Sequence, residues 1–265
     1  MSRRDADSGH SAVDDAGSDE HQSVVFVHGA MFTRKLWLPQ VRGLADDYHT
    51  VAFDLPGHGD RANEPFRMNP AIAVLEHVIE AETDGSAVVV GLSLGGYVAT
   101  EYAYRYPDDV DGLVLTGSSA NPVGGMETLT RGVGTLARLA TNPDVGERAV
   151  QRLGERWVRN RDLPTDVEAA IIEAGIYPRQ FGNAGPEIAG EDFRAKLSTY
   201  PGPTLVLNGE HDKIMRRGER AHAGAAQDAR LEVLAGVGHI CNLHRPATYT
   251  DRVRRFLRQR VVTTQ

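Results

Sequence analysis

A serine lies at the centre of a short glycine-flanked segment that follows directly on the apolar run Ala87–Val90. Gly91 and Gly95 stand on either side of Ser93, and the next residues, Tyr97–Tyr102, are suited to a helix. A strand, a sharp turn and a helix together lift a serine hydroxyl clear of a sheet. The glycines let the strand and the helix approach closely, and the first helical N–H groups can stabilise negative charge. The pattern therefore predicts that Ser93 is a catalytic nucleophile.

A serine hydroxyl attacks well only when a base removes its proton and an acid orients that base. Two suitable side chains follow Ser93 in the chain, each just after an apolar, strand-like run. Asp212 follows Thr204–Leu207, and His239 follows Leu231–Leu234. Both should leave the same edge of a parallel sheet as Ser93. We therefore expect Ser93, His239 and Asp212 to act as nucleophile, base and orienting acid.

The order of these three residues and four further motifs resemble the α/β-hydrolase superfamily over residues 22–262. The motifs are Val27-His28-Gly29-Ala30, Asp54-Leu55-Pro56-Gly57-His58-Gly59, Asn208-Gly209-Glu210-His211-Asp212 and Gly236-Val237-Gly238-His239. The resemblance implies that Ser93 attacks a carbonyl carbon and that the backbone N–H groups of Ala30 and Leu94 form the oxyanion hole. It also implies an eight-stranded, mostly parallel sheet with a helical cap, and it implies no cofactor and no metal.

The pattern along the chain predicts an α/β fold, a mostly parallel sheet with helices on both faces. Short apolar runs alternate with amphipathic stretches over residues 22–119 and 187–265, and runs that are apolar on both faces are typical of covered parallel strands. Residues 120–186 contain helical stretches but no convincing strand, so we expect a helical cap above Ser93. Residues 1–21 are rich in Asp, Ser and Gly, and we expect a disordered acidic tail.

The net charge, the apolar content and the cysteine count limit which kinds of partner this protein can bind. The net charge of −7 argues against nucleic acid as a main partner and gives no support for binding anionic membranes. No apolar stretch approaches the roughly 20 residues of a membrane span. Cys241 is the single cysteine, so an intrachain disulfide is excluded. We expect a cytoplasmic protein that acts on a small molecule.

Other residues compete for the same roles. Asp54 also follows a strand-like run and Glu210 lies two residues before Asp212, so each is an alternative acid. His28 and His58 are better explained as structural side chains near the oxyanion segment. The expected activity is cleavage of a carboxylic ester or lactone of a small to medium apolar molecule. A triad of this kind also supports C–C bond hydrolysis or hydroxynitrile-type lyase chemistry, and some relatives are ligand receptors with little turnover.

Overall fold

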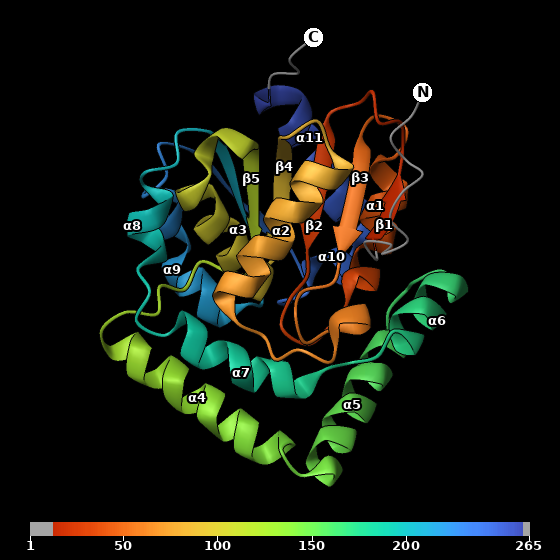
Figure 1. The fold of residues 1–265 in the computed structure, drawn as a ribbon, viewed down its shortest axis with the longest axis vertical. Coiled ribbons are helices and arrows are strands. Elements are labelled where there is room, and N and C mark those ends of the chain that lie inside the picture. Colours follow the sequence, from red (N-terminus) through yellow and green to blue (C-terminus); the bar gives the residue numbers. More distant parts are fainter. Residues whose placement is uncertain (1–12, 262–265) are drawn as a thin grey trace.

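The fold is built around a seven-stranded sheet in the order β1-β3-β2-β4-β5-β6-β7, seen in a computed structural model that describes residues 13–261 (Figure 1). The strands are β1 (Val13–Ala16), β2 (Ser23–Val27), β3 (His49–Phe53), β4 (Ala87–Leu92), β5 (Val110–Thr116), β6 (Pro203–Gly209) and β7 (Asp228–Leu234). Every neighbouring pair is parallel except β1 and β3. The predicted fold class, a mostly parallel α/β sheet, is confirmed.

Helices cover both faces of the sheet because alternate strand residues point to opposite sides. Val24 and Phe26 pack in one apolar cluster with residues of α1 and α11, while Val25 and Val27 pack in a second cluster with residues of α2 and α3. The helices of the core are α1 (Leu38–Leu44), α2 (Met68–Glu82), α3 (Leu94–Arg105), α8 (Phe193–Leu197), α9 (Lys213–Ala223), α10 (Cys241–His244) and α11 (Pro246–Arg260), with short 3₁₀ turns η1 (Arg34–Trp37), η2 (Gly59–Arg61) and η3 (Pro107–Asp109).

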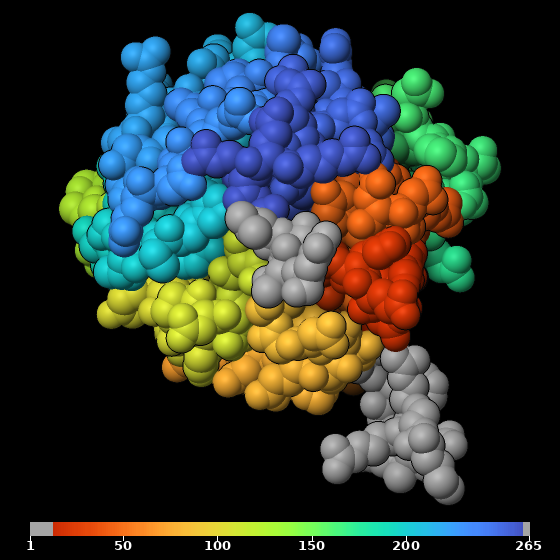
Figure 2. All heavy atoms as spheres, turned by 90° about the horizontal axis from the view of Figure 1, so that it is seen from above, coloured from red at the N-terminus to blue at the C-terminus, as the bar shows by residue number. Residues whose placement is uncertain are grey.

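Helix α11 packs beside α1 in the N-terminal part of the core. Figure 2 shows the blue C-terminal segment bordering the orange segment. Gln40 Nε2 donates to Thr250 Oγ1 at 3.3 Å, and Arg254 Nε lies 3.3 Å from Asp47 Oδ2, so α11 is joined to the N-terminal part of the core.

No helix among residues 13–261 combines the length and apolar character needed to cross a membrane.

Four helices between β5 and β6 form the predicted helical segment along one edge of the sheet (Figure 1). They are α4 (Gly125–Thr141), α5 (Asp144–Arg159), α6 (Thr165–Glu173) and α7 (Pro178–Ile188). Helix α7 continues to Ile188, two residues past the expected end of the cap at residue 186. Helices α4 and α7 cross closely: a Cβ on Gly185 would lie only 2.8 Å from the Cα of Gly134.

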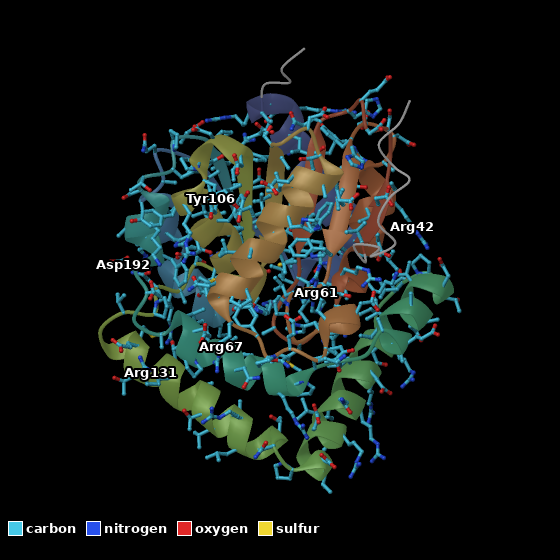
Figure 3. The ribbon with its side chains drawn as sticks, viewed as in Figure 1. Arg42, Arg61, Arg67, Tyr106, Arg131 and Asp192 are labelled. Atoms are coloured by element: carbon cyan, nitrogen blue, oxygen red, sulfur yellow. The ribbon has the colours of Figure 1, made fainter. Side chains whose placement is uncertain are left out.

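Polar contacts fasten these helices to the core. Arg67, labelled in Figure 3, lies 3.2 Å from Glu187 of α7, whose other oxygen accepts the Met68 N–H at 2.9 Å. Deeper in the junction, Gln180 Oε1 accepts the Phe66 N–H at 3.1 Å. Exposed ion pairs contribute about 0–1 kcal/mol each. The backbone hydrogen bonds therefore carry more of the attachment than the exposed ion pair does.

The expectation of a disordered tail over residues 1–21 is wrong for the part that the structure describes. Val13–Ala16 forms β1, which pairs with β3 in the antiparallel sense. The acidic side chain of Asp14 is neutralised by Lys35 Nζ at 2.5 Å, and the Ala16 carbonyl accepts the Thr50 hydroxyl at 3.0 Å. Residues 1–12 lie outside the described residues. The family resemblance implied eight strands, whereas residues 13–261 contain seven.

One buried histidine in α9 lacks polar partners. His222 is 1% exposed, and neither ring nitrogen has a hydrogen-bond partner within the described part of the chain. Burial lowers the pKa of His222 to about 4, and the positive charge of Arg194 acts in the same direction. His222 is therefore neutral in the folded protein at neutral pH.

This lowered pKa makes stability depend on pH. An exposed imidazole has a pKa of about 6.5, so the unfolded chain binds a proton at His222 before the folded protein does. The stabilising contribution is complete above pH ~6.5 and is lost as the pH falls toward the folded pKa of about 4. His222→Leu should reduce the slope of unfolding free energy against pH by up to about 1.4 kcal/mol per unit in this window. Urea unfolding across the window measures the slope. The same substitution at the exposed His77 should leave it unchanged, and an equal effect at both positions would contradict the prediction.

Candidate active site

Ser93 occupies a strained turn between β4 and α3. Its φ of +55° is the one positive value at a non-glycine residue in the described chain. The Ser93 N–H donates to the Thr116 carbonyl at 2.7 Å, which fixes the turn to β5. A Cβ on Gly91 would lie 2.4 Å from the Gly95 carbonyl oxygen, and one on Gly95 would lie 2.1 Å from that of Val27. Backbone strain held in place by its surroundings is typical of a functional site.

Asp212 and His239 form a pair at the ends of β6 and β7. His239 Nδ1 donates to Asp212 Oδ2 at 2.5 Å. The other carboxylate oxygen of Asp212 accepts the Met215 N–H, so Asp212 also caps the N-terminus of α9. Asp212 is buried, whereas His239 is partly exposed. A hydrogen bond at Nδ1 leaves Nε2 of the imidazole as the nitrogen that can accept a proton.

The loop after β5 touches both the serine turn and the imidazole. Thr116 accepts the Ser93 N–H, and the next residue, Gly117, packs against His239. A Cβ on Gly117 would lie 2.9 Å from His239 Cε1, and the residue has a φ of +59°. A larger side chain would displace the imidazole as well as strain the backbone. Gly117 therefore brings the predicted nucleophile and the predicted base to the same edge of the sheet.

A buried amide holds this loop in place. Asn208 is fully buried at the end of β6, and its Oδ1 accepts the Gly117 N–H at 3.1 Å. Its Nδ2 donates to Ser119 Oγ at 2.9 Å and to Glu219 Oε2 of α9 at 3.3 Å. The Ser119 hydroxyl in turn donates to the Met215 carbonyl. The motif that contains Asn208 assigns it no role in the sequence, and the available signal is a polar amide that closes an apolar strand.

The predicted oxyanion donors lie beside the serine. Ala30 and Leu94 line the same cavity as Ser93. Leu94 is the first residue of α3, and the first N–H groups of a helix have no intrahelical partner. A Cβ on Gly29 would lie 3.4 Å from the Cβ of Ser93, so the loop before Ala30 packs directly on the serine. The two N–H groups therefore come from elements that meet at Ser93.

Two buried histidines brace the loop that carries Ala30. The Leu55 N–H donates to His28 Nε2 at 2.9 Å, so the His28 proton is on Nδ1, which donates to Gly29 O at 2.8 Å. His58 Nε2 lies 2.9 Å from Ala30 O. Burial lowers the pKa of both imidazoles, and the mutual influence of the two rings lowers that of His28 further. These contacts fit the structural roles expected for His28 and His58.

The alternative acids are engaged elsewhere. Asp54 Oδ1 accepts the Arg34 N–H at 2.8 Å, and its other oxygen pairs with the Arg34 guanidinium. Glu210 Oε2 accepts the Gly236 N–H at 2.7 Å and so ties together the loops after β6 and β7. The contact with the imidazole of His239 is made by Asp212.

Among residues 13–261, no three His, Cys, Asp or Glu side chains lie close enough together to bind a metal ion.

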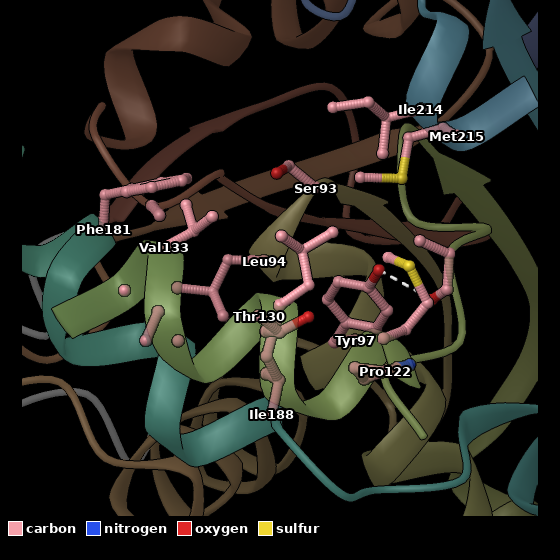
Figure 4. Close-up of a pocket in the computed structure, with 17 residues that line it drawn as sticks. Ser93, Leu94, Tyr97, Pro122, Thr130, Val133, Phe181, Ile188, Ile214 and Met215 are labelled. Atoms are coloured by element: carbon pink, nitrogen blue, oxygen red, sulfur yellow. Dashed lines mark hydrogen bonds between the residues drawn. The ribbon is translucent and has the colours of Figure 1, made fainter. Parts of the chain in front are cut away.

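The cavity at Ser93 has a volume of about 200 Å³ and lies between the core and the cap (Figure 4). Its walls come from the loops after β2, β4 and β5 and from α3, α4, α7 and α9. The lining residues are Ala30, Ser93, Leu94, Tyr97, Ala120, Pro122, Met126, Leu129, Thr130, Val133, Gly134, Phe181, Ala184, Gly185, Ile188, Ile214 and Met215. None of them carries a charged side chain. The Tyr97 hydroxyl donates to the Ala120 carbonyl at 2.8 Å, so the cavity is predominantly apolar.

Residues 24–252 match the model of the alpha/beta hydrolase family. The chain belongs to the alpha/beta hydrolase family. It is 29% identical over 269 residues to a pimeloyl-[acyl-carrier protein] methyl ester esterase of Nitrosospira multiformis, covering 90% of this chain and 95% of that protein. It is 22% identical over 260 residues to a carboxylesterase of Bacillus subtilis, covering 91% and 82%. Family and relatives together identify a hydrolase that resembles the carboxylesterases.

A solved structure supports the same fold. The enol-lactonase of Burkholderia xenovorans superposes with a TM-score of 0.72 at 21% identity, covering 93% of this chain and 95% of that chain. At this identity the likeness shows the fold alone. The assignment of Ser93, Asp212 and His239 as the reacting residues is therefore not taken from this likeness.

The role of Asn208 in this hydrolase can be tested by unfolding. Asn208→Ala removes the acceptor for the Gly117 N–H and the donor to Glu219, both of which are buried. Leaving buried polar groups unpaired costs about 1–3 kcal/mol each, so the free energy of unfolding should fall by about that amount or more. Urea titration followed by circular dichroism gives the value. Asn63→Ala, at an exposed turn, is the control, and equal stability of the two variants would show that the amide does not hold the loop.

Proposed function

We propose that this protein is a serine hydrolase that cleaves a carboxylic ester or lactone of a small to medium apolar molecule through an acyl-enzyme on Ser93. The observation that carries the proposal is the strained turn at Ser93, which presents the serine to an apolar cavity. The 2.5 Å contact between His239 and Asp212 supplies a base with an orienting acid at the same edge of the sheet. The esterase relatives support ester bonds as the substrate class.

The geometry supports a two-step acyl transfer. His239 Nε2 takes the proton of Ser93 Oγ as the oxygen attacks the carbonyl carbon, and Asp212 stabilises the imidazolium that forms. The N–H groups of Ala30 and Leu94 stabilise the oxyanion of the tetrahedral intermediate. As this intermediate collapses, His239 returns the proton to the leaving alcohol. Water then attacks the acyl-enzyme with His239 as base, and the acid and free Ser93 are released.

The cavity walls indicate which substrates fit. A lining without charged side chains favours an apolar acyl or alcohol group over an ionic one. We further propose that residues 120–186, extended to the end of α7, act as a cap that sets substrate choice, because α4 and α7 supply one wall. A cytoplasmic location is part of this proposal.

The nucleophile can be tested directly. A fluorophosphonate probe should label the wild-type protein, because the activated hydroxyl attacks phosphorus. Ser93→Ala should abolish both the labelling and the hydrolysis of p-nitrophenyl butyrate. Ser198→Ala, which changes an exposed hydroxyl that does not line the cavity, should keep the labelling. The measurements are mass spectrometry of the labelled peptide and release of nitrophenolate. Full activity in Ser93→Ala would show that another group attacks.

The assignment of the acid can be tested by comparing three neutral isosteres. Asp212→Asn should favour the wrong imidazole tautomer and lower turnover by up to about four orders of magnitude with the fold intact. Asp54→Asn and Glu210→Gln should change turnover far less, because their carboxylates contact Arg34 and Gly236 and not the imidazole. Circular dichroism monitors folding, and steady-state kinetics give turnover. Near-native turnover in Asp212→Asn beside a collapse in either other variant would mean that the acid is another residue.

A further inference from the structure

The cap wall of the cavity is open to solvent along α4. Met126, Leu129 and Val133 line the cavity on successive turns of this helix. The same side chains are 36%, 55% and 43% exposed, so each faces the cavity on one side and solvent on the other. Phe181 of α7 lines the cavity beside Val133 and is 43% exposed as well (Figure 4). The cavity therefore has an apolar rim on the cap side.

The apolar rim continues past the cavity. Leu136 follows Val133 by three residues and Leu129 by seven, a spacing that places all three on one face of the helix. Leu136 is 67% exposed, and Ala140, a further turn along, is exposed too. We call Leu129, Val133, Leu136 and Ala140 the α4 stripe. Contiguous exposed apolar surface often marks a site that binds a ligand or a partner.

Helix α7 does not cover the α4 stripe. The two helices meet through glycines on another face of α4, where a Cβ on Gly134 would lie 3.0 Å from the Cα of Gly185. Further along the contact, a Cβ on Gly182 would lie 2.7 Å from the Arg138 nitrogen. This close crossing aligns α7 beside the stripe and leaves the leucine side chains mostly exposed, Leu129 by 55% and Leu136 by 67%.

We propose that the α4 stripe binds the distal part of an apolar substrate chain whose ester group is held at Ser93. The proposal rests on the proposed function and deepens it by naming the substrate class, esters with a medium to long apolar chain. The cavity of about 200 Å³ is smaller than the roughly 300–1,000 Å³ of typical ligand sites. A longer chain must leave the cavity, and the stripe is an apolar surface continuous with it that extends along α4.

The expected effect of chain length follows from apolar transfer. Full burial of one methylene changes an equilibrium constant by about fourfold, and a methylene lying on an open stripe should gain about half of that in free energy, or about twofold. Because the stripe runs about two turns beyond Val133, the gain should continue for chains that exceed the cavity. The substrate chain, rather than a second protein, is favoured because the same residues line the cavity and begin the stripe.

The experiment measures kcat/KM for p-nitrophenyl butyrate, hexanoate, octanoate, decanoate and dodecanoate below their solubility limits. The wild type should gain about twofold per methylene up to the longest chains. Leu136→Ser should leave the butyrate rate unchanged and lower the dodecanoate rate by about fivefold. Leu153→Ser is the control, since Leu153 is also 67% exposed but lies on α5 and does not line the cavity.

Three outcomes would overturn the proposal. One is a wild-type preference that peaks at butyrate, and another is an equal loss at all chain lengths in Leu136→Ser. The third is a dimer in sedimentation that Leu136→Ser dissociates without changing the chain-length profile, which would make the stripe an interface between copies. Failure of the proposed function itself looks different: no ester of any length is hydrolysed, and the fluorophosphonate probe leaves Ser93 unlabelled.

Discussion

The close approach of three backbone segments around Ser93 is the constraint on which the site depends. Gly91 and Gly95 face each other across the turn, and Gly95 also faces the carbonyl of Val27 at the end of β2. A single methyl group at either glycine would push β4, α3 and β2 apart. With the glycines in place, the Ser93 backbone is forced to a positive φ. The strain is stabilised by the rigidity of the buried parallel strands on both sides.

The loops that carry the other site residues are held by buried polar side chains. Asn208 fixes the Gly117 loop, Glu210 ties together the loops after β6 and β7, and His28 holds the segment before Ala30. Each of these side chains bonds to backbone groups, so the loops keep one conformation although they have no regular secondary structure. In a preorganised site of this kind, the free-energy cost of rearranging the protein is small when charge develops in a reaction.

Much of this was predictable because the signals are local in sequence. Six strands can be recognised in the sequence as apolar runs. Residues Gly91–Gly95 contain the glycines that a tight strand-to-helix turn requires. Strand β1 was missed because its sequence, Val-Asp-Asp-Ala, resembles a solvated tail. The charge of Asp14 in this strand is neutralised by Lys35, a residue distant in sequence. The role of Asn208 and the glycine crossing of Gly134 with α7 were missed for the same reason: they depend on pairs of segments that only the fold brings together.

The two walls of the cavity differ in how firmly the protein holds them. Ten of the twelve residues of α3 are buried, whereas only Gly134 and Thr141 of the seventeen residues of α4 are. Segments with few buried contacts occupy the low end of local stability, so α4 should open before the sheet does. The rigid wall carries Ser93, the proposed nucleophile, and the position of a nucleophile tolerates little error. The loosely packed wall contributes apolar surface, which binds without demanding exact orientation. The proposed chemistry and the proposed chain selection thus fall on parts of the fold with the mechanical properties that each requires.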